Sequence, residues 1–237
     1  LVGLTLPAAP RAPRPVTARD AGFARRYARM LVAGLGEVRR VRTVRNGVLL
    51  AALLLGTTAY DEYFALLAID KGAAETVVPL LVGVTVAGQV VSTALAGRTS
   101  HVGAPVLTYV IGVAGVLLVL GAFIAQPLAF AAIGVGYGMV SNATIVAESR
   151  LQDAIEGEAR ATVTSVVGLT SEVAAVAVFA TFALASAVWT VSASFGLVCA
   201  LVVVVAALTP GWLPPRAEPS PVEHGEVRDP SDERGGG

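Results

Sequence analysis

Six apolar runs of about twenty residues each occupy most of the sequence between Gly47 and Leu208. At a rise of 1.5 Å per residue, a helix of about twenty residues crosses the roughly 30 Å hydrocarbon core of a bilayer. The connections between the runs are short, so consecutive helices should be antiparallel neighbours. The predicted spans are Gly47 to Ile69, Thr76 to Gly97, Ala104 to Ala125, Pro127 to Ala147, Thr162 to Ala185 and Trp189 to Leu208.

The composition agrees with a membrane location. Of the 237 residues, 55% are hydrophobic and only 14% are charged, whereas a soluble domain carries about 25% charged residues. The sequence therefore predicts an all-α integral membrane protein with six transmembrane helices.

The basic residues give the predicted orientation. Ten of the seventeen are arginines between Arg11 and Arg45, and only Lys71 falls in a connection on the opposite side of the membrane. Because basic residues collect in cytoplasmic segments, we expect both ends of the chain in the cytoplasm. The expected location is a plasma membrane of the bacterial type.

Four segments organise the chain. Residues 1–7 look like the end of a truncated preceding helix, and residues 8–45 like a basic cytoplasmic linker that includes an amphipathic helix at the membrane surface. A solvated basic linker is an equally good interpretation of 8–45. Residues 46–212 form the predicted membrane domain, and residues 213–237 a disordered tail rich in Pro, Glu, Arg and Gly. We expect either a fragment of a longer protein or a half that associates with itself.

Three carboxylates lie inside the apolar runs: Asp61, Glu62 and Glu172. A charge at the centre of a membrane helix costs about 2.5 to 3.5 kcal/mol on insertion scales, so such a residue usually has a function. Since consecutive helical residues point about 100° apart, Asp61 and Glu62 should have different roles. We predict that one of the three carboxylates couples transport to a proton or cation. Pairing with an arginine outside this chain, or tethering of a helix end, is the structural alternative.

Neutral polar residues recur on one face of several runs. Thr85, Gln89, Ser92 and Ala96 form a stripe in the second run. The third and sixth runs carry almost no strong polar groups, so the six runs read as two three-helix repeats. Ordinary packing through small residues explains any single stripe about as well as substrate contact. The predicted substrate-cavity residues are Thr58, Gln89, Ser92, Asn142 and Ser171.

The stretch Glu148-Ser149-Arg150-Leu151-Gln152, followed by Arg160 to Ser165, is similar to the cytoplasmic crossing between helices ten and eleven of the major facilitator superfamily. The chain resembles the C-terminal six-helix half of such a transporter. Leu1 to Pro7 would be the end of the sixth helix and Ala8 to Arg45 the central loop. The resemblance implies that the third helix of each triplet is peripheral while the others line the cavity.

Charged residues near the predicted cytoplasmic helix ends suggest an inner gate. A salt-bridge network of Glu148, Arg150, Glu158 and Arg160 could lock it, although a role in topology and solubility is equally reasonable. The loop motif of the family, of the type Gly-Asp-Arg-Gly-Arg, survives only in part as Gly97-Arg98 and Gly103, without its acidic residue and its later basic residue. A positive-inside anchor is therefore the favoured alternative to a gating role for Arg98. The predicted cytoplasmic gate residues are Arg98, Glu148, Arg150 and Arg160.

These patterns predict half of a secondary transporter that moves a small solute by alternating access against a missing N-terminal six-helix half. No run contains a basic residue, which favours a neutral or cationic organic solute exported against a proton. A non-transporting scaffold or sensor is the alternative, but it would not need three buried carboxylates. An intramembrane protease would need a nucleophile with a base inside the helices, yet His101 and His224 both lie outside the runs. We therefore expect no enzyme activity. We also expect no cofactor, no metal and no nucleic-acid partner, and membrane lipid around the helices.

Overall fold

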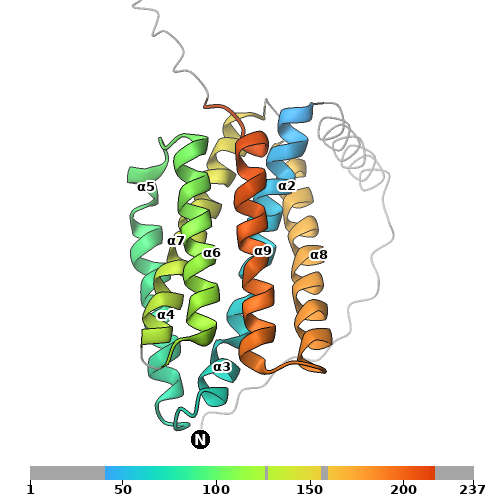
Figure 1. Cartoon of the computed structure of the whole chain (residues 1–237). Coiled ribbons are helices and arrows are strands. Elements are labelled where there is room, and N and C mark those ends of the chain that lie inside the picture. Colours follow the sequence, from blue (N-terminus) through green and yellow to red (C-terminus); the bar gives the residue numbers. More distant parts are fainter. Residues whose placement is uncertain (1–40, 126–127, 156–159, 217–237) are drawn as a thin grey trace, which may run out of the picture.

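The structure is a computed structural model that describes residues 41–125, 128–155 and 160–216. Every regular element in these residues is a helix (Figure 1), which confirms the predicted all-α class. The predicted truncated helix, the linker up to residue 40 and the tail from residue 217 lie outside the described residues. The elements are α2 (Arg42–Thr57), η1 (Thr58–Tyr63), α3 (Phe64–Asp70), α4 (Val78–Ala94), α5 (Ala96–Thr99), α6 (Ala104–Phe123), α7 (Leu128–Asp153), α8 (Arg160–Ser186) and α9 (Val191–Trp212).

Five helical segments in the described part of the chain are long and apolar enough to cross a membrane. They are Arg42–Asp70, which joins α2, η1 and α3, and the helices α6, α7, α8 and α9. The second predicted span instead forms the shorter α4 of 17 residues, followed by the separate turn α5. The helices are therefore those of an integral membrane protein, with five spans of full length where the sequence predicted six.

The fourth predicted span is longer than expected. It was predicted to end at Ala147, but α7 continues to Asp153. The extra turns bury Arg150 and Leu151, at 5% and 1% exposed. Leu151 packs in a small apolar cluster with Val48 and Val163 from α2 and α8. Burial of these two side chains stabilises the last turns of α7, in a stretch whose charged residues predicted a loop.

The core lies where α2, η1, α3, α7 and α9 meet. The rings of Tyr60, Phe64, Tyr137 and Phe195 pack together with centroids 5.4 to 6.3 Å apart, mostly edge to face. Around this cluster, α6 packs along α9 and α7, while α2 packs along α8. Helix α4 packs chiefly against α7, at the edge of the bundle in Figure 1.

Glycines bring α4 and α7 into backbone contact. A Cβ at Gly88 would collide with the carbonyl oxygen of Gly134, and a Cβ at Gly138 would collide with that of Gly88. Gly134 and Gly138 are four residues apart and so share one face of α7. Small residues at this spacing allow membrane helices to approach closely, because lipid gives no hydrophobic drive for association. The close approach sets the position of every polar side chain that α4 presents to α7.

Lys71 joins the first span to the end of α6. Its Nζ donates hydrogen bonds to the carbonyl oxygens of Ala122, at 2.8 Å, and Ile124, at 2.7 Å. The last carbonyl groups of a helix have no intrahelical donor and carry the negative end of the helix dipole. Burial lowers the pKa of Lys71, and the neighbouring Asp70 acts in the opposite direction. The single basic residue of this connection is thus a cap for α6.

Replacing Lys71 with Met is expected to lower the free energy of unfolding by about 1 to 3 kcal/mol, because two hydrogen bonds from a charged donor are lost. The measurement is thermal unfolding in detergent with a thiol-reactive dye, which reaches the single, fully buried Cys199 only on unfolding. Glu75→Gln, an exposed change in the same connection, is the control. Equal unfolding temperatures for the two variants would contradict the capping role.

Candidate functional site

The first span is interrupted where its two carboxylates lie. Asp61 and Glu62 belong to η1, a six-residue 3₁₀ segment between α2 and α3. Runs of 3₁₀ helix longer than three or four residues are uncommon, and one inside a helix often marks a hinge or a strained site. The hydroxyl groups of Thr57 and Thr58 donate to the carbonyl oxygens of Leu54 and Leu55, at 3.0 and 2.6 Å. Such side-chain bonds compete with the helical ladder and bend helices, which gives a local reason for the break.

The break lies deep in the predicted membrane region. Asp61 is nine residues before the end of α3 at Asp70, and Tyr137 is nine residues after the start of α7 at Leu128. At 1.5 Å per residue, nine residues correspond to about 13 Å of helix. This depth is close to half of the roughly 30 Å hydrocarbon core.

Four side chains from η1, α4 and α7 form a hydrogen-bonded group, which we call the Asp61 network. The Tyr137 hydroxyl donates to Oδ2 of Asp61 at 2.7 Å. Nε2 of Gln89 donates to the Tyr137 hydroxyl at 3.1 Å and lies 3.4 Å from Oγ of Ser141. The Ser141 hydroxyl in turn donates to the carbonyl oxygen of Tyr137 at 3.0 Å. The bonds from Gln89 to Tyr137 and from Tyr137 to Asp61 direct proton donors towards the half-buried Asp61 carboxylate, while Ser141 ties the group to the α7 backbone.

The glycine contact explains why this network can form. Tyr137 lies between the glycines of α7 that touch α4, and Gln89 follows Gly88 on α4. Backbone contact at Gly88 therefore brings the Gln89 amide within reach of α7. Asp61 and Gln89 were among the predicted site residues, and Tyr137 was not. The missed signal is a phenolic hydroxyl flanked by close-packing glycines and four residues before Ser141.

The other two carboxylates differ from Asp61. Glu62 and Glu172 are exposed, and neither makes a side-chain hydrogen bond within the part of the chain that the structure describes. With three residues per turn, neighbouring side chains in η1 point about 120° apart. When Asp61 faces Tyr137, Glu62 therefore points in another direction. Carboxylates at this depth do not face lipid, because charged groups in membranes turn to protein or to water. Both side chains thus mark a surface that needs a wet or polar neighbour.

The predicted substrate-cavity residues fall into separate places. Asn142 joins α7 to the α4–α5 junction, since Nδ2 donates to the Ser92 carbonyl oxygen at 2.8 Å and Oδ1 accepts from the Thr99 hydroxyl at 2.9 Å. These three residues line a cavity of about 200 Å³. The hydroxyl groups of Thr58 and the buried Ser171 instead donate to carbonyl oxygens three residues earlier in the chain. The structure therefore groups Ser92 with Asn142, and Gln89 with Asp61.

No ion pair joins the described members of the predicted gate, and Glu158 lies outside the described residues. Arg98 and Arg160 are exposed, Glu148 is half-buried and Arg150 is buried. Instead, a neutral hydrogen bond of 2.8 Å from Nε2 of Gln152 to the Thr164 hydroxyl links the ends of α7 and α8.

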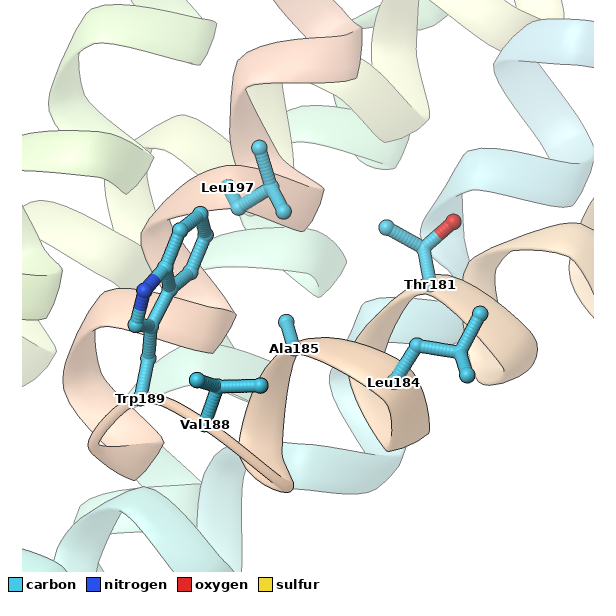
Figure 2. A pocket seen from close by; sticks show the side chains of 6 residues that line it. All are labelled: Thr181, Leu184, Ala185, Val188, Trp189 and Leu197. Carbon is cyan, nitrogen blue, oxygen red and sulfur yellow. The ribbon is translucent and has the colours of Figure 1, made fainter.

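A separate apolar cavity of about 370 Å³ lies between the end of α8 and the start of α9 (Figure 2). Its one hydroxyl, on Thr181, already donates to the carbonyl oxygen of Ala177 at 2.7 Å. Leu184 and Val188 are 75% and 82% exposed. Because its lining is mostly apolar and carries no ionisable group, and because its walls are so exposed, this cavity suits lipid chains and is not the candidate site. The lining residues are Thr181, Leu184, Ala185, Val188, Trp189 and Leu197.

Two tyrosines beside Asp61 give opposite predictions. The Tyr60 hydroxyl is buried without a hydrogen-bond partner, whereas the Tyr137 hydroxyl bonds to Asp61. An unsatisfied buried polar group costs about 1 to 3 kcal/mol. Tyr60→Phe is therefore expected to raise the unfolding temperature, and Tyr137→Phe to lower it, in the Cys199 dye assay. A lower unfolding temperature for Tyr60→Phe would show that its hydroxyl has a partner.

The described residues contain no group of three or more His, Cys, Asp or Glu that could hold a metal ion. No protein-family model, curated protein or solved structure matched the chain. The candidate site is thus characterised by its own geometry: a carboxylate in a broken span, held by a tyrosine and an amide from two other helices.

Proposed function

We propose that the chain is one half of a proton-coupled secondary transporter and moves a small solute across the membrane by alternating access. The observation that carries the proposal is the Asp61 network inside the η1 break. Ionisable residues within membrane helices mark ion pathways, and the sites of transporters are often built where helices are interrupted. The proposed family is the major facilitator superfamily, for which the motif resemblance is the support.

Asp61 is the proposed proton carrier. As a carboxylate it accepts the Tyr137 hydroxyl, and Tyr137 accepts the Gln89 amide. Once protonated, Asp61 gains a donor of its own and no longer attracts the Tyr137 proton as a charged acceptor does. Proton loading would thus weaken a connection between η1, α4 and α7. A change in the contact between a broken helix and its neighbours is the kind of step that alternating access requires.

The helix arrangement supports the proposed division of roles. The two plain helices, α6 and α9, pack along each other and, in this proposal, do not line the substrate cavity. Glu62 and Glu172 lie on exposed surface and would face a water-filled cavity shared with an N-terminal six-helix half. In this proposal α4 completes six spans arranged as two triplets, and the helix ends near Arg42 face the cytoplasm. The solute would be neutral or cationic and organic.

The test measures dye accumulation in inverted membrane vesicles with an imposed pH gradient. A panel of cationic and neutral organic dyes, with ethidium as the first, serves as the probe. Vesicles with the wild-type protein should accumulate at least one dye in response to the gradient, and Asp61→Asn should not. Glu62→Gln and Glu172→Gln identify whether the exposed carboxylates contribute. Wild-type accumulation in all three variants would rule out carboxylate coupling and favour a scaffold or sensor.

A further inference from the structure

A second polar cavity, of about 300 Å³, lies at the end of the bundle where α2 begins and α7 and α9 end, the upper end in Figure 1. Its walls come from three parts of the chain: the start of α6, the last turn of α7 and the segment after α9. The lining includes His101, Gly103, Ala104, Arg150, Pro214 and Arg216. No carboxylate is among these described residues, so the cavity carries only basic ionisable groups.

Arg150 forms the buried side of this cavity. Its side chain is only 5% exposed, and one terminal nitrogen donates to the Val102 carbonyl oxygen at 2.9 Å. Its Nε is buried with no hydrogen-bond partner, and no ion pair to Arg150 occurs in the described residues. A guanidinium has five N–H donors, and burying its charge without a counter-charge is costly. The position calls for an anionic partner.

The start of α6 adds a second, independent source of positive potential. Gly103 precedes the helix in an extended conformation, and no side chain of the described residues caps it. The first intrahelical bond runs from the Leu107 N–H to the Gly103 carbonyl oxygen, so the N–H groups of Ala104 and Val106 have no acceptor within the helix. Free N–H groups and the helix dipole make such an end suitable for phosphate.

The third wall is held in place by contacts with α2. Nδ2 of Asn46 donates to the Gly211 carbonyl oxygen at 3.3 Å. A Cβ at Gly47 would lie 2.7 Å from Cγ of Pro214, so the chain after α9 crosses α2 at a distance that only glycine allows. These contacts hold the segment that brings Arg216, which is exposed, into the lining of the same cavity as the buried Arg150.

From these observations we propose that the cavity binds a phosphate group, carried either by an anionic phospholipid or by free inorganic phosphate. Guanidinium groups bind phosphate oxygens with paired hydrogen bonds, and Arg is preferred over Lys where the donor is buried. The cavity lies at helix ends, at the level of lipid headgroups, where basic pockets between membrane helices bind anionic lipids. This site is separate from the Asp61 network and does not depend on the proposed transport function.

The test uses the whole chain in detergent, with added phosphatidylglycerol, phosphatidylcholine or inorganic phosphate. Lipid retention is measured by native mass spectrometry and the unfolding temperature with the Cys199 dye. Wild type should retain phosphatidylglycerol over phosphatidylcholine and unfold at a higher temperature with it. Arg216→Gln and Arg150→Gln should weaken this binding about tenfold, as expected for loss of a charge-assisted bond. Arg98→Gln, an exposed arginine outside the cavity lining, should bind as wild type does.

The two sources give different results. Stabilisation by inorganic phosphate that requires Arg216, without a preference for phosphatidylglycerol, would assign the cavity to the free ion. Arg216→Gln decides alone if Arg150→Gln does not fold, because the Arg216 side chain is exposed. The proposal is overturned if neither form of phosphate binds in a manner that depends on Arg216, or if Arg98→Gln loses binding to the same extent.

Discussion

Asp61→Asn is expected to reduce gradient-driven dye accumulation by about a hundredfold or more, the lower range for loss of a positioned proton-transfer group. Asparagine has the size of aspartic acid and can still accept the Tyr137 hydrogen bond, but it does not titrate. The variant should therefore fold and bind solute while losing the response to pH. The measurement is dye accumulation with an imposed gradient, compared with dye exchange at equal pH on both sides.

Exchange at equal pH is the internal control, and Asp61→Asn should retain it. Asp61→Glu should keep part of the accumulation, because the carboxyl remains but its distance to Tyr137 changes. Tyr137→Phe should lie between wild type and Asp61→Asn, since it removes the 2.7 Å hydrogen bond and leaves the carrier. Full accumulation by Asp61→Asn together with its loss in Glu172→Gln would move the coupling role to α8.

Gly88→Ala should be the most destabilising small substitution in the described chain, by about 3 kcal/mol or more. The added Cβ would meet the Gly134 carbonyl group, and backbone atoms cannot turn aside as a side chain can. Helices α4 and α7 would have to separate, which also pulls Gln89 away from Tyr137. The unfolding temperature in the Cys199 dye assay should fall, and any coupled accumulation should fall with it.

Gly83→Ala is the matched control on the same helix. A Cβ at Gly83 would have no atom within 4 Å, and alanine is a better helix former than glycine by about 1 kcal/mol. This variant should be neutral or slightly more stable than wild type. If Gly83→Ala and Gly88→Ala unfold at the same temperature, the close contact between α4 and α7 does not exist as described.

Hydropathy predicts the helices of this chain but not their interruptions. The first apolar run looks continuous in sequence because the same residue types occur in α-helix and in 3₁₀ helix. The change from one to the other follows the side-chain bonds of the Thr57 and Thr58 hydroxyls. The end of α7 was also missed, because Arg150 reads as a loop residue until its burial against other segments is known. The first feature depends on the geometry of side-chain bonds that span only three residues, and the second on contacts between parts of the chain that are far apart in sequence.

The sequence identified several residues of the site, but it did not show which residues bond to one another. The free-energy cost of charge in hydrocarbon identifies Asp61, Glu62 and Glu172 as unusual, and helical period places Gln89 on a polar face of its helix. Period does not identify the facing helix, so the bond between Asp61 and Tyr137 could not be derived. The positive-inside rule treats Arg150 as one of many topological charges, whereas the fold buries it beside a cavity.

The short α4 has a consequence for the surrounding bilayer. At 1.5 Å per residue its 17 residues extend about 25 Å, less than the roughly 30 Å of hydrocarbon around it. Leu80, Val84 and Val91 are exposed along its length. A change in the tilt of α4 would break its glycine contact with α7. Where lipid surrounds α4, the hydrophobic mismatch is met by local thinning of the bilayer, by flanking residues that reach the interface, or by association with another protein. Membranes with shorter acyl chains should accommodate this protein with less strain than thick ones.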